Sequence, residues 1–334
     1  MGETIRERTE ALEHRILAPY AVFANAAVRE LPEEECPMRT AYQRDRDRII
    51  HSAAYRRLMY KTQVFLFPQG DHYRTRLTHT QEVGQIARTI ARALRLNEDL
   101  TEAMAMGHDL GHTPFGHAGE YALRDVSPIH FRHSEQSVRV VERLESDGRG
   151  LNLTRDVKHG ILCHSDGMPW ADSLEGRVVR YADKIAYINH DIEDAIRGGV
   201  LRQEDIPRAV IEGLGERKSQ RISTLVASIV ENSTPEEIKM DEKTYKLYEE
   251  LKAFLFDAVY KNPLAKGEEG KAKDIVALLY RYFAEHPQRM PEEYRRIACE
   301  EGAERAAVDY ISGMSDRYCV SMYEELYIPK PWDR

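Results

Sequence analysis

The pattern that most constrains this chain is its helical periodicity, because apolar side chains recur every three to four residues while alternation with a period of two is scarce. Residues 78–96 show it most clearly, with apolar positions at Val83, Ile86 and Ile90. The same face, extended backwards by one turn, meets His79. We therefore predict an all-α fold in which this helix turns a histidine toward the interior.

Two further predicted helices also carry polar side chains on faces that should be buried. Over residues 99–110, Met104 and His108 lie at i, i+4 spacing on the apolar face. The helix predicted over residues 174–197 stops at a pair of glycines, and it has Asp183 and its i+4 neighbours on one stripe where a plain core helix would be apolar. Histidines and carboxylates thus point inward from three helices.

Five other segments have apolar or aromatic residues at helical spacing, which predicts helices over residues 40–60, 134–146, 243–261, 272–285 and 303–325. The 334 residues, 42% of them apolar, are enough to bury a large core without disulfide or metal support. No polar stretch between these segments is long enough to be a linker between domains.

Composition also bounds the function. The four cysteines form no C-x-x-C pair, which argues against a thiolate metal site and favours a reducing compartment. A net charge of -8 with no sustained basic tract makes nucleic acid an unexpected main partner. No run reaches 18 apolar residues and the N-terminus opens charged, so we expect a cytoplasmic protein that does not cross a membrane.

The segment GHDLGHTPFGHAGE, residues 107–120, concentrates three histidines, an aspartate and a glutamate in fourteen positions. A lone His108 would more often be a satisfied core histidine than a metal ligand. The adjacent Asp109, with His79 and Asp183 on other core faces, favours a mixed nitrogen and oxygen site suited to Mg, Mn, Fe, Ni or Zn. Such an ion neutralises phosphate charge and lowers the pKa of bound water, as hydrolysis of a phosphate ester requires.

Five blocks stand in order along the chain: RDRDRIIHSAAYRRLMYKTQVF, GDHYRTRLTHTQEVGQIARTIARALRL, GHDLGHTPFGHAGE, RYADKIAYINHDIEDAI and DYISGMSDRY. Together they resemble the HD superfamily, named for its His…His-Asp…Asp metal site, and within it the dGTP triphosphohydrolase-like proteins. The bare metal motif would be a weak match, whereas five ordered blocks cover most of the chain. The resemblance implies one all-helical domain over residues 1–334. Its HD core would span about 40–200, followed by a helical insert at about 201–298 and a closing C-terminal helix over 303–325.

The resemblance implies four metal ligands, namely His79, His108, Asp109 and Asp183. His117 and Glu120, one helical turn apart, resemble the catalytic pair of the family, in which the carboxylate orients the imidazole that transfers a proton. His112 and His133 resemble further catalytic imidazoles that face the phosphates. A helix-capping role beside Gly111 is the alternative for His112.

The resemblance also implies five substrate-binding residues, namely Gln63, Arg76, Lys184, Tyr187 and Asp191. Arg76 resembles an arginine whose guanidinium fork contacts phosphate oxygens, although a surface salt bridge is the alternative. Lys184 and Tyr187 resemble residues that hold phosphate and sugar. Gln63 and Asp191 resemble residues near the deoxyribose 3′-hydroxyl, with a solvated loop as the alternative for Gln63. The C-terminal block is interpreted as a helix that closes the core, without a catalytic role.

The activity implied is that of a metal-dependent dNTP triphosphohydrolase, acting on dGTP or on dNTPs more broadly and releasing deoxynucleoside and inorganic triphosphate. The resemblance also implies a homo-oligomer. The alternatives are another HD phosphohydrolase, such as a 5′-nucleotidase or a phosphodiesterase, or a nucleotide-binding sensor without turnover. The presence of both His117 and Glu120 weighs against the sensor. Three histidines, namely His159, His164 and His190, receive no role, and packing is the favoured interpretation of each.

Overall fold

The computed structural model describes residues 2–66, 72–263 and 267–331. Over these residues the chain is built from helices, and its only extended pairings are two isolated β-bridges, so the predicted all-α fold is confirmed. None of the helices in this part of the chain is long and apolar enough to cross a membrane.

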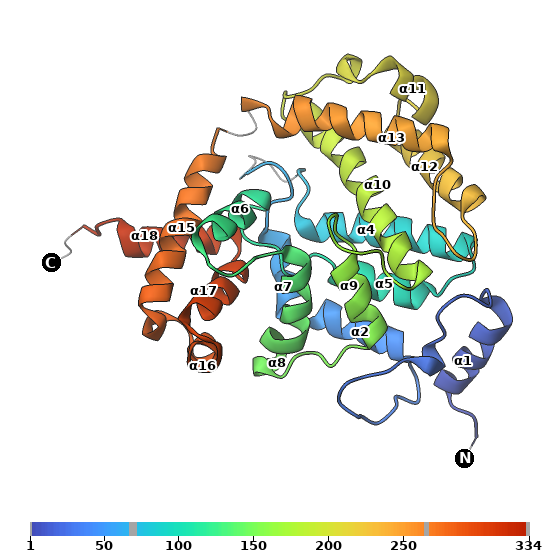
Figure 1. Cartoon of the computed structure of the whole chain (residues 1–334), viewed down its shortest axis with the longest axis horizontal. Coiled ribbons are helices and arrows are strands. Elements are labelled where there is room, and N and C mark those ends of the chain that lie inside the picture. The colour runs from blue at the N-terminus through green and yellow to red at the C-terminus, as the bar shows by residue number, and fades with distance from the viewer. Residues whose placement is uncertain (1, 67–71, 264–266, 332–334) are drawn as a thin grey trace.

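The helices up to residue 197 form the centre and lower right of Figure 1. They are α1 (Ile5–Ile16), α2 (Ala41–His51), α3 (Ala53–Arg57), α4 (Arg76–Ala93), α5 (Glu98–Gly107), α6 (His117–Val126), α7 (His133–Arg139), α8 (Glu145–Gly148), α9 (Arg155–Cys163) and α10 (Leu174–Arg197).

The later helices lie on two sides of this centre. Those at the top of Figure 1 are α11 (Arg208–Leu214), α12 (Lys218–Asn232) and α13 (Glu242–Leu255). Those at its left are α15 (Glu269–Glu285), α16 (Glu292–Glu301), α17 (Ala303–Ser312) and α18 (Asp316–Tyr327).

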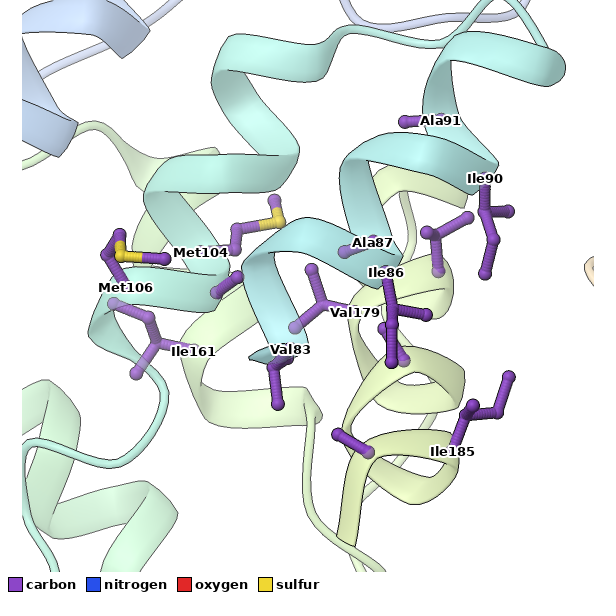
Figure 2. Packing of buried hydrophobic residues seen from close by; sticks show 14 of the residues in the cluster. Val83, Ile86, Ala87, Ile90, Ala91, Met104, Met106, Ile161, Val179 and Ile185 are labelled. Carbon is purple, nitrogen blue, oxygen red and sulfur yellow. The ribbon is translucent and has the colours of Figure 1, made fainter. Parts of the chain in front are cut away.

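The apolar face of α4 forms the middle of the larger core. Val83, Ile86 and Ile90 are buried as their spacing predicts, and they pack against α5 and α10. Figure 2 shows Met104 of α5 and Val179 of α10 close to Val83 and Ile86 of this face. Because His79 lies one turn before Val83, burial of this face carries the histidine into the interior.

A second core joins α6 to the C-terminal helices α15 to α18. Residues 201–298 contribute to both cores, since Leu225 and Leu251 pack in the first and Val276 and Leu279 in the second. The division of the chain into an HD core and a helical insert stays a prediction.

Local capping explains where the observed helices match the predicted ranges and where a predicted helix is interrupted. Helix α10 covers the predicted range, with the hydroxyl of Ser173 accepting the N–H of Gly176 at its start and Gly198 after its end. The single helix predicted over 40–60 is wrong, because Ser52 adopts extended backbone and caps a new helix, α3.

The C-terminal helix predicted over 303–325 is likewise wrong as one element. The segment forms two helices instead: α17 ends at Ser312, and α18 begins at Asp316 with Ser315 as its N-cap, which accepts the N–H of Tyr318. Two other predicted helices end in π-helical turns, at Val140–Leu144 and Phe256–Tyr260. Such turns often occur at functional sites.

Candidate active site

The four predicted metal ligands converge in the interior. His79 comes from the first turn of α4, Asp183 from the middle of α10, and His108 and Asp109 follow α5. His79 Nε2 lies 3.1 Å from Asp183 Oδ1 and 3.8 Å from Asp109 Oδ2. His108 Nε2 lies 3.4 Å from Asp109 Oδ1.

This cluster fits a divalent metal ion. Donor atoms of His79, His108 and Asp109 lie within 4.8 Å of one another. His108 Nδ1 is 2.7 Å from the carbonyl oxygen of Ala105, so it donates the ring proton there and leaves Nε2 with a lone pair. That Nε2 is buried and has no hydrogen-bond partner among the described residues. Nitrogen and oxygen donors of this kind suit Mn, Fe, Ni or Zn.

Both carboxylates of the cluster are held in the ionised form. Burial alone would raise the pKa of Asp109, but His108, His112 and Arg76 hold it well below its usual range. Burial would likewise raise the pKa of Asp183, and the neighbouring His79 lowers it instead. Two anionic oxygen ligands are therefore available to a cation.

Three residues, His190, Asp191 and Tyr260, form a second layer behind His79. Sequence reasoning assigned no functional role to His190 or Tyr260. His79 Nδ1 is 2.9 Å from His190 Nε2, and His190 Nδ1 is 2.7 Å from Asp191 Oδ1. The hydroxyl of Tyr260, in the π-helical turn after α13, donates a hydrogen bond to Asp191. Asp191 is only 2% exposed, and its contact with the 3′-hydroxyl stays a prediction. His190 lies seven residues after Asp183, which was a usable helical signal, whereas nothing in the sequence pointed to Tyr260.

Arg76 lies inside the cluster, so the alternative of a surface salt bridge is wrong. Its side chain is 3% exposed, and Nη1 donates to Asp109 Oδ2 at 2.8 Å. A Cβ at Gly116, where φ is +57°, would lie 3.2 Å from Arg76 Nη2 and 3.5 Å from the carbonyl oxygen of Gln63. The missing side chain thus allows the Gln63 loop and Arg76 to approach the histidine-rich segment.

The loop that carries Gln63 is anchored, which rules out a solvated loop there. Lys61 is buried, and its Nζ donates to the carbonyl oxygens of His112 and, at 2.7 Å, of Ser312. Gln63 Oε1 is itself buried and has no hydrogen-bond partner among the described residues. An unpaired acceptor at this depth is suited to a ligand hydroxyl.

Lys184 and Tyr187 follow Asp183 on α10. Lys184 Nζ lies 2.6 Å from Asp166 Oδ1. Asp166 lines a cavity of about 210 Å³ together with Glu120, Arg132 and His133. Tyr187 is partly buried, and this burial raises the pKa of its hydroxyl. The predicted phosphate and sugar residues therefore lie beside the metal cluster, and their roles stay predictions.

Glu120 contacts a different histidine more closely than the one predicted. Its Oε2 is 3.0 Å from His133 Nδ1 but 3.9 Å from His117 Nδ1, and Arg124 pairs with Oε1. Burial alone would raise the pKa of Glu120, but His117 and His133 hold it below its usual range. The side chain of His117 is 65% exposed. The carboxylate orients His133 in this structure, and proton transfer by His117 stays a prediction.

Three further imidazoles surround Asp109. His112 Nε2 lies 3.4 Å from Asp109 Oδ1, and its ring stacks on that of His133 with centroids 4.1 Å apart. The ring of His164 lies 4.9 Å from that of His108 and 5.3 Å from that of His133. Burial lowers the pKa of His164 to about 3, so its imidazole is neutral. Sequence reasoning favoured packing for His164, yet the structure places it at this cluster.

The C-terminal block DYISGMSDRY ties the loops of the site together. Asp316 accepts the backbone N–H of Thr62 and that of Phe115, each at 2.9 Å. Asp309 accepts from both Nε and Nη2 of Arg139, on the helix that carries His133. These residues touch the segments that bear Gln63, His117 and His133, although sequence reasoning gave the block only a packing role.

Comparison with known proteins agrees with this arrangement. The HD domain family matches residues 76–188, and the phosphohydrolase-associated domain family matches residues 238–325. A deoxyguanosinetriphosphate triphosphohydrolase-like protein from Caldanaerobacter subterraneus subsp. tengcongensis is 56% identical over 330 residues, covering 98% of this chain and 97% of that protein. A protein with the same description from Desulfatibacillum aliphaticivorans is 48% identical, covering 98% and 99%. A crystal structure of a hypothetical protein from Aquifex aeolicus matches with a TM-score of 0.50 at 18% identity, over 86% of this chain and 68% of that one, which supports the fold alone.

Proposed function

Because this chain belongs to the deoxyguanosinetriphosphate triphosphohydrolase-like family of HD-domain proteins, we propose that it is a metal-dependent hydrolase of deoxynucleoside triphosphates. The products would be deoxynucleoside and inorganic triphosphate. The observation that carries the proposal is the buried cluster of His79, His108, Asp109 and Asp183 with the guanidinium of Arg76 beside it. Such a cluster suits a highly anionic substrate that must react away from bulk water.

The four clustered residues would hold one divalent ion. When bound, such an ion supplies Lewis acidity toward phosphate oxygens and water. Arg76 presents a planar fork, of which Nη1 is engaged by Asp109 while Nη2 lies toward Gly116. With Nη1 engaged, Nη2 and the buried Nε, which has no hydrogen-bond partner among the described residues, remain as the two donors for oxygens of one phosphate.

The cavity beside the cluster carries cationic and imidazole groups that could contact the remaining phosphates, although Glu120 and Asp166 also line it and pair with two of the cations. Arg124, His130 and Arg132 line it together with His133. Lys184 lies next to it through its pair with Asp166. These groups would orient the triphosphate, which lowers the entropy cost of reaching the reactive geometry.

Proton transfer falls to the histidines around Glu120. The carboxylate holds His133 at 3.0 Å and lies 3.9 Å from His117, so a small rotation of the exposed His117 would bring it into hydrogen-bond range. We propose His117 as the group that transfers a proton, with Glu120 orienting it, and His112 and His133 as imidazoles that face the phosphates.

Product analysis tests the proposal. The protein is incubated with each dNTP and Mn²⁺ or Mg²⁺, and the products are separated by ion exchange. Deoxynucleoside with triphosphate supports the proposal. Monophosphate with pyrophosphate, or no turnover of any dNTP, contradicts it and supports another HD hydrolase or a sensor.

A paired variant tests the assignment of roles. His117→Ala should lower turnover by about two to four orders of magnitude while leaving bound metal unchanged. His51→Ala removes an exposed histidine at the end of α2 and should leave turnover at the wild-type value. Wild-type turnover of His117→Ala would show that the proton moves by another route.

We also propose that the chain is a cytoplasmic homo-oligomer. Support comes from α1, where Ile5, Leu12 and Ile16 are 41% to 50% exposed along one side. Sedimentation equilibrium at micromolar concentration tests the assembly, and a monomer throughout would contradict it.

A further inference from the structure

Asp166 lies at the edge of the cavity beside the metal cluster and faces a group of cations. Its Oδ1 is 2.6 Å from Lys184 Nζ and 3.4 Å from Arg180 Nη2. Its Oδ2 is 3.7 Å from Lys252 Nζ. Asp166 lines the cavity of about 210 Å³, whereas none of these three cations does. One carboxylate therefore separates three positive charges from the cavity.

The two cations on α10 are held in place by packing. The side chains of Lys184 and Arg180 are 16% and 8% exposed, and the guanidinium of Arg180 lies 4.3 Å from the centre of the Trp170 ring. Among the described residues, Asp166 is the only carboxylate that forms an ion pair with either of them. When this carboxylate is elsewhere, two fixed and largely buried positive charges lack a counter-ion and attract another anion.

The carboxylate, unlike the cations, belongs to a turn that is closed without it. Asp166 precedes Gly167, whose φ is +84°, and the N–H of Met168 donates to the carbonyl oxygen of Ser165 across the turn. Arg180 Nη1 also donates to the carbonyl oxygen of Met168 at 3.0 Å. The side chain of Asp166 is 55% exposed. It can therefore rotate into solvent while the backbone of the turn stays in place.

We propose that Asp166 is an internal counter-ion of the phosphate site, which occupies Lys184 and Arg180 in the free protein until the phosphate chain of the substrate displaces it. This inference rests on the proposed function, in which the triphosphate lies in this cavity. An ionised phosphate oxygen accepts from the same donors as a carboxylate oxygen. Asp166 thus competes with the substrate and, after the reaction, with the triphosphate product, so its presence weakens the binding of both.

Binding of inorganic tripolyphosphate tests this inference without requiring turnover. The anion is titrated by calorimetry into each protein in the same Mg²⁺ buffer, so that its chelation of Mg²⁺ is the same in every titration. Asp166→Asn should bind tripolyphosphate about 2- to 25-fold more tightly than wild type, because two exposed ion pairs contribute about 1.4- to 5-fold each. Asp172→Asn is the matched control, since it removes the same charge from the same loop at a side chain that is 96% exposed. Its affinity should equal that of wild type.

Two further variants show whether the gain depends on the charge that faces the lysine. Asp166→Glu keeps the charge and should keep the wild-type affinity. In a Lys184→Met background, Asp166→Asn should give a smaller gain than in the wild-type background, because one of the two cations that it would release is absent. An equal gain in both backgrounds would overturn the inference.

Three other results would also overturn the inference: equal or weaker binding by a folded Asp166→Asn, the same gain in Asp172→Asn, or no binding of tripolyphosphate by any of the proteins. Thermal unfolding checks that each variant is folded, and Asp166→Ser replaces the asparagine variant if that one is not. Tighter binding by Asp166→Asn, in a protein whose wild type hydrolyses no dNTP, would support the counter-ion and contradict only the proposed function.

Discussion

Replacing His190 should weaken metal binding without touching a ligand. In the metal-free protein the proton of His79 can lie on Nε2 and face Asp183 Oδ1 at 3.1 Å. An ion on Nε2 forces that proton onto Nδ1, where His190 Nε2 at 2.9 Å is its acceptor. Removing the acceptor therefore penalises only the metal-loaded state, because a buried N–H is then left unpaired.

The expected magnitude follows from that unpaired group. An unsatisfied buried donor costs about 1–3 kcal/mol, and each 1.4 kcal/mol is about tenfold in affinity. His190→Leu should thus bind Mn²⁺ about 5- to 150-fold more weakly, which agrees with the loss of about 10- to 100-fold when an outer partner of a metal ligand is removed. His190→Gln keeps a side-chain oxygen as acceptor and should recover most of the affinity.

The assay is a competition titration of the tightest Mn²⁺ against a chelator, with thermal unfolding as a check on folding. His51→Leu is the matched control, since it makes the same substitution at an exposed histidine. A folded His190→Leu with wild-type affinity would refute the reasoning, and so would a His190→Gln as weak as the leucine variant.

Three further predictions concern the site and the stability of the fold. Asp109→Ala should abolish both bound metal and dNTP hydrolysis, because it removes a ligand from the centre of the cluster, and full metal content by elemental analysis would contradict this. GTP should be hydrolysed far more slowly than dGTP in initial-rate assays, because the sugar is proposed to lie between Gln63 and the hydrogen-bonded pair of Asp191 and Tyr260, which would leave little room for a 2′-hydroxyl; equal rates would show that the sugar pocket is misassigned. Burial raises the pKa of Glu13 to about 7, so the folded protein holds this proton more tightly than the unfolded chain, and stability should fall as pH rises toward and through about 7. Melting temperatures at pH 5 and pH 8 should show that Glu13→Gln removes part of this fall, and an identical pH dependence in both proteins would contradict it.

The sequence was enough to predict the buried helices and the meeting of His79, His108, Asp109 and Asp183 in the interior, whereas their role as metal ligands stays a prediction. Helical spacing placed His79 and His108 on core faces, and it set both ends of α10, because these features depend on local periodicity and punctuation. The break between α17 and α18 had a local signal as well, in Gly313 followed by Ser315 as a cap. Apolar spacing continues across it, which is why one helix was predicted.

Other parts of the site depend on contacts between distant segments, and a single sequence does not show these. Tyr260 contacts Asp191 from 69 residues away, and Lys61 reaches Ser312 across 251 residues. The preference of Glu120 for His133 over His117 depends on the turn between α6 and α7, although His117 is nearer in sequence. Helical spacing predicts which residues are neighbours on one helix, but it does not predict contacts between residues of different segments.

The two hydrogen bonds accepted by Asp316 can form only late in synthesis, because the aspartate lies far along the chain from both amides. Phe115 leaves the ribosome 201 residues before the aspartate that accepts its N–H, and Thr62 leaves 254 residues before it. At a synthesis rate of about 5–20 residues per second, Asp316 is added roughly 10–40 s after Phe115. All four predicted metal ligands have been synthesised by residue 183, well before Asp316 can accept these two amides. A nascent chain would therefore contain all four predicted ligands well before the loops that bear Gln63 and His117 can be tied to the C-terminal block.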